Sequence, residues 1–417
     1  METTSENRGP TVVFVGQLID GTGAEPRWNV GLIVEDGVIT RIDEVSRIPR
    51  GFPVLDLGTD TVLPGLINMH AHATLPGDGT PFAEWMELPD EILVLQAYAN
   101  ALVALRSGVT TIRDCGGRGQ IMFRVRDAIR RGIVPGPRLI LCGRALTITG
   151  GHCHYFGGEA DGPDQMRRAA RQLLREGADF VKIMASGGGT IGTYPQFPAF
   201  ETDEMRAAID EAHKIGKRAS CHCLAIESIE RALDAGTDHI EHCMFVFPDT
   251  SVRYDEVVGR RVADAGVYVT ATLQVMADLP SGLLERHTRG EASEEEAGYI
   301  REVAQTIDAH ITTIGYLHEI GVPIVAGSDA GWRDTGFDDF YEELQYLARA
   351  GLSPIEAIHA ATGRAAEACQ LAGVIGTLAE GCVADMVALT DDPLDDLSNL
   401  KNPVTVLQSG RIVVDRR

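Results

Sequence analysis

From residue 63 to residue 376 the chain alternates short apolar runs of strand length with amphipathic stretches of helical period. The apolar runs are LINMH (66–70), VTTIRDC (109–115), PRLILCG (137–143), DFVKIMA (179–185), RASCHC (218–223), HIEHC (239–243), VYVTATL (267–273) and PIVAGSDA (323–330). Eight β–α units in about 300 residues favour a closed parallel barrel over an open sheet. We therefore predict an α/β fold built on a (β/α)8 TIM barrel.

The two ends of the chain have a different pattern, with β segments over residues 11–62 and again over residues 383–415. EDG at 35–37 and SGR at 409–411 are typical of hairpin turns. Because the ends of a domain often lie close together, both ends can contribute to one small domain. We expect a β-sandwich domain of residues 1–62 plus 377–417, and the barrel over residues 63–376.

Acidic residues outnumber basic ones, with 60 Asp and Glu against 37 Lys and Arg, which gives a formal net charge of −23. Nucleic acids and anionic membranes bind basic faces, so neither is expected as a partner. No apolar run reaches the ~18 residues of a membrane-spanning helix, and METTSENRGP at the N-terminus lacks the features of a secretory signal. Eight cysteines are too few for a disulfide scaffold in a chain of this length, so we expect free thiols and a cytoplasmic location.

Polar side chains at the carboxyl ends of the strands are the first candidates for function, because barrels of this class place their chemistry there. His70 and His72 end the first strand, and since side chains alternate along a strand, both point to one face. Two imidazoles on one face can bind one metal ion. Two ordinary surface histidines would give the same pattern, and this alternative is favoured while the pair is considered alone.

Lys182 lies within the apolar run of the fourth strand. Burying a charged amine is costly, so a lysine at this position is either chemically altered or extends to the rim of the barrel. A neutral amine can react with CO2 to form a carbamate, whose two oxygens can bridge two metal ions. The rim position is the simpler alternative if no other ligand lies nearby.

Three further strands carry metal-binding residue types at the same end. His222 lies between two cysteines in the fifth strand and faces inward if the cysteines face the helices. His239 and His242 are three residues apart in the sixth strand, so alternation predicts opposite faces, and His242 is the better candidate because it is nearer the carboxyl end. Asp329 follows the eighth strand, where a carboxylate can bind a metal and transfer protons, although it can also cap the next helix. Each residue has an ordinary structural explanation, but together they indicate a metal site.

These motifs resemble the amidohydrolase superfamily of metal-dependent hydrolases. PGLINMHAH (64–72) is similar to the first-strand motif of that superfamily, and IVAGSDA (324–330) is similar to its last-strand Asp motif. The flanking β segments are similar too, so the resemblance extends over nearly the whole chain. VKIMASGGG (181–189) and HCLAIESIERALDAGTDHIEH (222–242) resemble the branch that contains imidazolonepropionase-like proteins and binuclear Xaa-Pro and Xaa-Arg dipeptidases.

The resemblance implies two metal ions held by imidazoles, one carboxylate and an N6-carboxylated lysine: His70, His72 and Asp329 on the more buried ion, His222 and His242 on the second, and Lys182 bridging the two. Zn2+ suits such ligands, and Mn2+ or Co2+ also fit. The implied chemistry is attack of a metal-bridging hydroxide on an amide carbonyl, with Asp329 passing the proton to the leaving amine. The implied substrates are small peptides or N-acyl amino acids, and the implied assembly is a homo-oligomer.

The glycine-rich loop TITGGHCHYFGGEADG (147–162) after the third strand is predicted to contact the substrate, since loops at this end of a barrel carry binding residues. By the same resemblance we predict that His154 and Tyr155 are catalytic residues that contact an oxyanion or the substrate carboxylate. We predict His152 and Arg144 as further substrate-binding residues. A purely structural loop is the alternative. The polar segment 272–297 is either a lid or surface decoration.

Two other functions are compatible with the sequence. A mononuclear-metal deaminase, or a cyclic-amide hydrolase of the imidazolone type, would bind one ion and keep an unmodified Lys182. A barrel that has lost its metals and serves as an assembly partner is disfavoured, because the set of ligand residues is complete.

Overall fold

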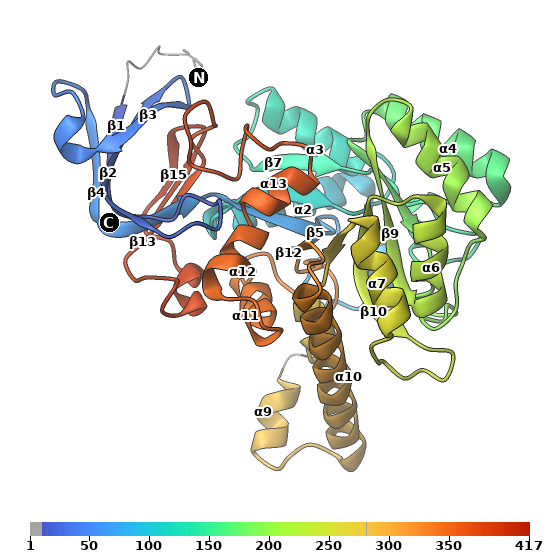
Figure 1. Cartoon of the computed structure of the whole chain (residues 1–417). Helices are drawn as coiled ribbons and strands as arrows, with labels where there is room; N and C mark the ends of the chain where they lie inside the picture. The colour runs from blue at the N-terminus through green and yellow to red at the C-terminus, as the bar shows by residue number, and fades with distance from the viewer. Residues whose placement is uncertain (1–10, 281) are drawn as a thin grey trace.

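The computed structural model describes residues 11–280 and 282–417. Both ends of the chain contribute to one seven-stranded sheet with the order β15-β14-β13-β4-β1-β2-β3. Its strands are β1 (Thr11–Leu18), β2 (Arg27–Glu35), β3 (Val38–Glu44), β4 (Val54–Pro64), β13 (Met386–Leu389), β14 (Thr405–Gln408) and β15 (Arg411–Asp415). Figure 1 shows the blue N-terminal strands close to the red C-terminal ones. Residues 1–10, which belong to the expected terminal domain, lie outside the described part of the chain.

Two tight hairpins shape this sheet. Asp36 and Gly37 join β2 to β3, and their φ angles are 50° and 81°. Positive φ at both central residues is the type I′ turn, whose twist matches that of the strands and which favours Asp-Gly. Ser409 and Gly410 join β14 to β15 in the same way, with φ angles of 49° and 69°. Both turns predicted from the sequence are therefore confirmed.

The middle of the chain forms two parallel sheets with the orders β5-β6-β7 and β12-β11-β10-β9-β8. Their strands are β5 (Leu66–Ala71), β6 (Val109–Asp114), β7 (Arg138–Leu141), β8 (Phe180–Met184), β9 (Arg218–Ala225), β10 (His239–Val246), β11 (Tyr268–Thr270) and β12 (Ile324–Val325). Each of these strands overlaps one of the apolar runs predicted to be a strand. The α/β class with parallel strands is confirmed.

Backbone contacts connect the two parallel sheets on both sides. Beyond β7, Leu146 forms a parallel bridge to Ile183 in β8, and its backbone N–H donates to the carbonyl oxygen of Lys182 over 2.8 Å. On the other side, Ala71 in β5 forms a parallel bridge to Ala330, which follows β12. These bridges place the carboxyl ends of β5 and β8 in register with the segments beside them.

Helices connect successive parallel strands and cover them from outside (Figure 1). They are α1 (Phe82–Met86), α2 (Asp90–Arg106), α3 (Ile121–Arg130), α4 (Gly162–Glu176), α5 (Thr202–His213), α6 (Ile226–Ala235), α7 (Glu256–Ala265), α8 (Leu273–Ala277), α9 (Leu283–Thr288), α10 (Glu294–Glu319), α11 (Tyr341–Arg349), α12 (Pro354–Ala360) and α13 (Gly363–Ala368), with short 3-10 helices η1 (Val45–Arg47), η2 (His154–Phe156) and η3 (Leu397–Lys401). Strand and helix side chains share one large apolar core, to which Cys221 and Cys223 belong. Among the described helices, none combines the length and the apolar character needed to cross a membrane.

The segment predicted to be a lid or surface decoration, residues 272–297, forms α8, α9 and the beginning of α10, with Ser281 outside the described residues. Figure 1 shows α9 beside the outer part of α10, and both extend away from the rest of the molecule. Closure of this segment over a substrate stays a prediction.

Candidate metal centre

The structure gathers the predicted ligand residues at the carboxyl ends of β5, β8, β9 and β10 and in the turn after β12. All of them are buried, with exposed fractions of 6% or less: His70, His72, Lys182, His222, His242 and Asp329. A polar cluster removed from water in this way needs internal partners or bound ions. Its hydrogen bonds therefore indicate which atoms are left to bind a ligand.

Asp329 lies between the first two histidines. Its Oδ1 atom is 3.5 Å from Nε2 of His70 and 3.3 Å from Nε2 of His72. The other nitrogen of each ring forms a hydrogen bond with the protein. Nδ1 of His72 is 2.7 Å from the carbonyl oxygen of Gly116, and Nδ1 of His70 is 2.8 Å from Oε2 of Glu241. Since Nδ1 is the donor in both rings, each Nε2 presents a lone pair toward Asp329.

Glu241 in β10 is the buried carboxylate that contacts His70, and it is itself held by other buried side chains. It accepts hydrogen bonds from Nη1 of Arg113 over 2.7 Å and from Oγ of Ser220 over 2.5 Å. Burial raises the pKa of Glu241, but the charge of Arg113, together with smaller contributions from His239, Lys182 and His70, holds the pKa well below its usual range. A carboxylate behind an imidazole fixes the ring and increases the basicity of its other nitrogen, which is the usual arrangement behind metal-binding histidines.

His222 and His242 form the second half of the cluster. Their ring centroids are 4.5 Å apart, and the His242 ring is 5.0 Å from that of His70. Alternation predicted His239 and His242 on opposite faces, but this argument fails, because His242 has a φ angle of 67° and leaves the regular strand geometry. His239 lies on the side of Glu241, with its Nε2 atom 4.0 Å from Oε1.

Burial keeps the imidazoles of His70, His222 and His242 neutral. It lowers the pKa of His70 to about 4, with a further contribution from the nearby Lys182, and it lowers the pKa of both His222 and His242 well below the usual value. Burial raises the pKa of Asp329, but His70 and His72 lower it by more, so the net shift is downward. Neutral imidazoles beside a carboxylate are the protonation states that bind divalent metals.

Lys182 is fully buried in β8, and its Nζ atom has no hydrogen-bond partner among the described residues. The Oδ1 atom of Asp329 likewise has no hydrogen-bond donor there. Buried polar atoms are nearly always satisfied, so two such atoms in one cluster require an explanation. A bound cation and a modified lysine would satisfy both atoms.

Among the described residues, two groups of side chains are close enough to hold an ion. The ligand atoms of His70, His242 and Asp329 lie within 4.8 Å of one another, as do those of His70, Cys115 and Glu241. The second group does not fit a metal, because burial raises the pKa of the Cys115 thiol to about 12 and Glu241 already neutralises Arg113. The first group fits a divalent ion through neutral imidazole nitrogens and a carboxylate oxygen with no donor.

The loop after β7 reaches the cluster through His152. The His152 ring is 4.7 Å from that of His222 and stacks on Trp332 at 5.8 Å. His154 hydrogen-bonds within its own loop, to the carbonyl oxygen of Gly151, and Tyr155 packs against Phe82 at 4.4 Å. The structure thus brings His152 to the cluster, while the catalytic roles of His154 and Tyr155 stay predictions.

Arg144 binds two groups of the protein. Its Nη2 atom donates to Oε2 of Glu176 over 2.7 Å, and its Nη1 atom donates to the carbonyl oxygen of Gly119 over 3.1 Å. These contacts fix the guanidinium beside the carboxyl end of α4. Neither of these contacts joins Arg144 to the histidine cluster. Contact between Arg144 and a substrate stays a prediction.

A cavity of about 170 Å³ lies beside the cluster. Its wall is largely apolar and aromatic: Leu75, Pro76, Thr80, Phe82, Trp85, Gly331, Trp332 and Arg333. Trp332 connects this wall to the candidate ligands, because its ring lies edge-on to His72 at 6.2 Å and its backbone N–H donates to the carbonyl oxygen of Asp329. The cavity therefore offers space for an apolar group next to the candidate ligands.

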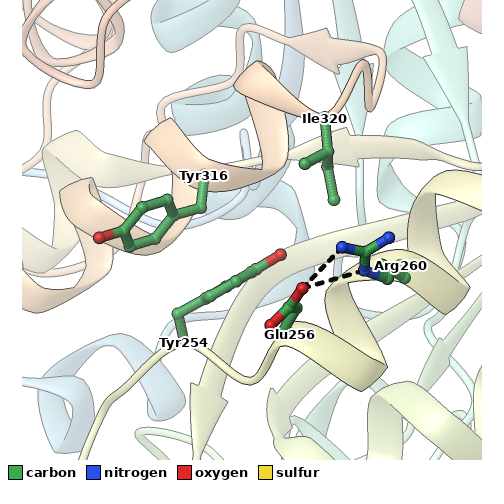
Figure 2. Close-up of a pocket in the computed structure, with 5 residues that line it drawn as sticks. All are labelled: Tyr254, Glu256, Arg260, Tyr316 and Ile320. Carbon is green, nitrogen blue, oxygen red and sulfur yellow. Dashed lines mark hydrogen bonds and ion pairs between the residues drawn. The ribbon is translucent and has the colours of Figure 1, made fainter.

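A second cavity, of about 530 Å³, lies on the outer surface between α7 and α10. Figure 2 shows Tyr254 and Tyr316 facing each other there, with Glu256 paired to Arg260. None of the predicted site residues lines it.

Sequence reasoning missed several residues that support the cluster: Arg113, Glu241, Thr272, His310 and Trp332. Glu241 and Arg113 had a signal in the sequence, since a charged residue in an apolar strand, as in HIEHCMFV and VTTIRDC, must be paired when it is buried. His310 acts through a contact distant in sequence, since 68 positions separate it from His242.

A family model described as "Amidohydrolase family" matches residues 61–413. Ochratoxinase from Aspergillus niger is 29% identical in sequence, over 95% of this chain and 84% of that protein. Imidazolonepropionase from Salinispora tropica is 22% identical over 90% of each chain. A solved structure of a Xaa-Pro dipeptidase with bound methionine in the active site superposes with a TM-score of 0.84, at 27% identity, over 97% of this chain and all of that one.

The buried Arg113–Glu241 ion pair generates a prediction about stability. Glu241→Gln leaves the Arg113 charge without its counter-ion, so we expect a loss of about 3–5 kcal/mol in the free energy of unfolding. Urea unfolding of the metal-free protein measures this loss. The double variant Arg113→Met/Glu241→Gln removes both charges and should lose less than the two single variants added together. Strict additivity would show that the two charges do not interact.

Proposed function

The chain belongs to the amidohydrolase family and is a hydrolytic enzyme that acts on amide bonds, and we propose that it is a binuclear zinc enzyme for a small peptide or N-acyl amino acid. The single observation that carries this proposal is Lys182, whose buried amine has no described partner within a cluster of four imidazoles and a carboxylate.

We propose further that the eight parallel strands close into one barrel over residues 63–376. The bridges from Leu146 to Ile183 and from Ala71 to Ala330 support closure, since they join the outer strands of both parallel sheets. For residues 1–62 plus 377–417 we propose a β-sandwich. The bridge between Val38 and Val383 supports it, because it brings the β3 edge of the seven-stranded sheet back toward the segment before β13.

The proposed ligands divide into two sets around Lys182. His70, His72 and Asp329 would hold the more buried ion, and their mutual distances of 3.3 and 3.5 Å support this assignment. His222 and His242 would hold the second ion. A carboxylated Lys182 would bridge the two, because a carbamate replaces an unpaired buried amine with an anion that two cations can neutralise. Zn2+ is the preferred ion for these ligands, with Mn2+ or Co2+ as substitutes.

When bound, the two ions supply an activated water and polarise the amide carbonyl. The residues of the chain provide the proton transfers and the positioning. The pKa of Asp329 lies below its usual value, so Asp329 is a carboxylate that can accept the proton of the attacking water and deliver it to the departing amine nitrogen. His152, stacked on Trp332, is placed beside the cluster to contact the developing oxyanion, and His154 and Tyr155 are proposed to bind the substrate from the same loop.

The cavity beside Trp332 supports a small substrate. Its volume of about 170 Å³ is close to the ~150 Å³ cavity that accepts a benzene molecule in another protein. A side chain of an amino acid fits such a space, whereas a folded protein substrate does not. The names of the matched proteins, a dipeptidase and an ochratoxinase, agree with a small-molecule substrate.

The second candidate is a mononuclear deaminase or cyclic-amide hydrolase, which the match to imidazolonepropionase favours. It leaves the unpartnered Nζ atom of Lys182 without a role. Counting the ions in each chain separates the two candidates, since the second requires one.

We also propose a homo-oligomer in the cytoplasm. Exposed apolar side chains on α9 and α10 support assembly: Leu284, Tyr299 and Tyr316. The eight cysteines are free and seven of them are buried, which fits a reducing compartment.

Lys182→Ala tests the bridging role. Removing an outer partner of a metal ligand costs about 10–100-fold in activity or metal affinity, so removing a bridging ligand should cost at least that much. We expect hydrolysis to fall at least about 100-fold and acetate to restore part of it by occupying the place of the carbamate. Steady-state kinetics with and without acetate measure both effects, with Lys182→Met as a control that fills the space. Near-wild-type activity in either variant would refute the role.

Asp329→Asn tests the proton transfer. The amide preserves the shape of the side chain but cannot accept the proton, so kcat should fall by about 100- to 10,000-fold while the thermal midpoint stays close to that of the wild type. Kinetics and calorimetry on the zinc-loaded protein provide the two values. Substantial remaining turnover would contradict the assignment.

The direct experiment on function is a hydrolysis screen of the purified, zinc-loaded protein against dipeptides and N-acyl amino acids, with metal content measured on the same sample. We expect two zinc ions in each chain and release of a free amine. One ion in each chain, with ammonia released from a cyclic amidine, would support the second candidate instead.

A further inference from the structure

The backbone of β10 is irregular at His242. β10 pairs regularly with β9 up to His242, and the register then shifts before Val246. In this stretch His242, Cys243 and Phe245 have φ angles of 67°, 51° and 56°. Residues with a side chain rarely adopt these angles, so surrounding contacts must hold them.

His310 supplies one such contact from α10. Its Nε2 atom is 2.8 Å from the carbonyl oxygen of His242, and because a carbonyl oxygen only accepts, Nε2 carries the proton. The His310 side chain is fully buried, and its Nδ1 atom has no partner among the described residues. The bond to His242 is therefore the polar contact that accounts for a histidine at this place.

Thr272 supplies the second contact, to the side chain. Its Oγ1 atom is 2.6 Å from Nδ1 of His242, and the same hydroxyl donates to the carbonyl oxygen of Ala271 over 2.8 Å. Since the hydroxyl proton is already used, Nδ1 of His242 must be the donor, which leaves the lone pair of the ring on Nε2. The hydroxyl thus selects the tautomer in which the free nitrogen can bind a metal.

The turn that carries Thr272 is itself held in place. Thr272 has a φ angle of 51°, and the backbone N–H of Gln274 donates to Oε2 of Glu343 over 2.8 Å. Glu343 lies in α11 and is fully buried. Helix α11 therefore holds the segment that faces His242, whereas α10 holds the backbone of His242 itself.

We propose that His310 and Thr272 are positioning residues for His242. His310 holds the left-handed backbone that turns the ring of His242 toward His70 and His222, and Thr272 fixes its tautomer. This proposal rests on the proposed function, because it assigns His242 to the second metal ion.

The test uses matched pairs of variants. His310→Leu removes the donor, whereas His310→Gln keeps an N–H group at a similar reach. Thr272→Val removes the hydroxyl at nearly constant shape, whereas Thr272→Ser keeps it. Zinc affinity is measured by competition with a chromophoric chelator. We expect the Leu and Val variants to bind the second ion about 10–100-fold more weakly while the first ion stays bound, and the Gln and Ser variants to bind as the wild type does.

A second measurement does not depend on metal. Long-range ¹⁵N NMR of histidine-labelled, metal-free protein reports the tautomer of each ring, and His242 is assigned by comparison with His242→Gln. We expect a single Nδ1–H tautomer for His242 in the wild type and a mixture of tautomers in Thr272→Val. This readout separates the two proposals, because a wild-type protein with one zinc ion would contradict the binuclear function without changing the tautomer.

The positioning proposal is overturned if His310→Leu and Thr272→Val fold, bind zinc with wild-type affinities, and leave the ¹⁵N shifts of His242 unchanged. Loss of the second ion in these two variants, together with its retention in His310→Gln and Thr272→Ser, supports it.

Discussion

Lys182 carries an amine into the interior of the molecule, where no described atom accepts a hydrogen bond from it. An isolated buried charge is costly enough that a group normally neutralises or acquires a partner. The surrounding side chains offer little compensation, because burial keeps the nearby His70 neutral and Glu241 is already paired with Arg113. In the proposed binuclear centre, metal ions and a carbamate on Lys182 would complete the charge balance of this site.

The residues that contact the candidate ligands determine the orientation of those ligands. Arg113 and Glu241 form a buried ion pair whose second carboxylate oxygen holds His70. Gly327 allows the backbone of β5 to lie close to the segment after β12, since a Cβ atom on Gly327 would lie 2.7 Å from the backbone nitrogen of His70. His242 has a left-handed backbone, and this conformation is needed because a regular strand would not turn the ring of His242 toward the cluster. The positions of the imidazoles thus depend on the Arg113–Glu241 ion pair, on the close backbone packing at Gly327 and on the irregular backbone at His242.

The sequence predicts the parts of this arrangement that follow from local pattern. Apolar runs predicted all eight parallel strands, and the position of His70 and His72 at a strand end was sufficient to identify them as candidates. His242 was chosen for its place near the carboxyl end, but the alternation argument behind that choice was wrong, because alternation assumes the regular geometry that His242 leaves. His310 could not be foreseen, since it approaches His242 from 68 residues away along a helix whose pattern indicates only an amphipathic surface.

The most direct measurement is a crystal structure of the zinc-loaded protein with anomalous diffraction data collected at the zinc edge. Our account predicts two anomalous peaks beside the histidine cluster and, between them, density for a carboxylate group continuing from Nζ of Lys182. Two zinc peaks beside a lysine that ends at Nζ would contradict the bridging carbamate, and a single zinc peak would contradict the binuclear centre itself.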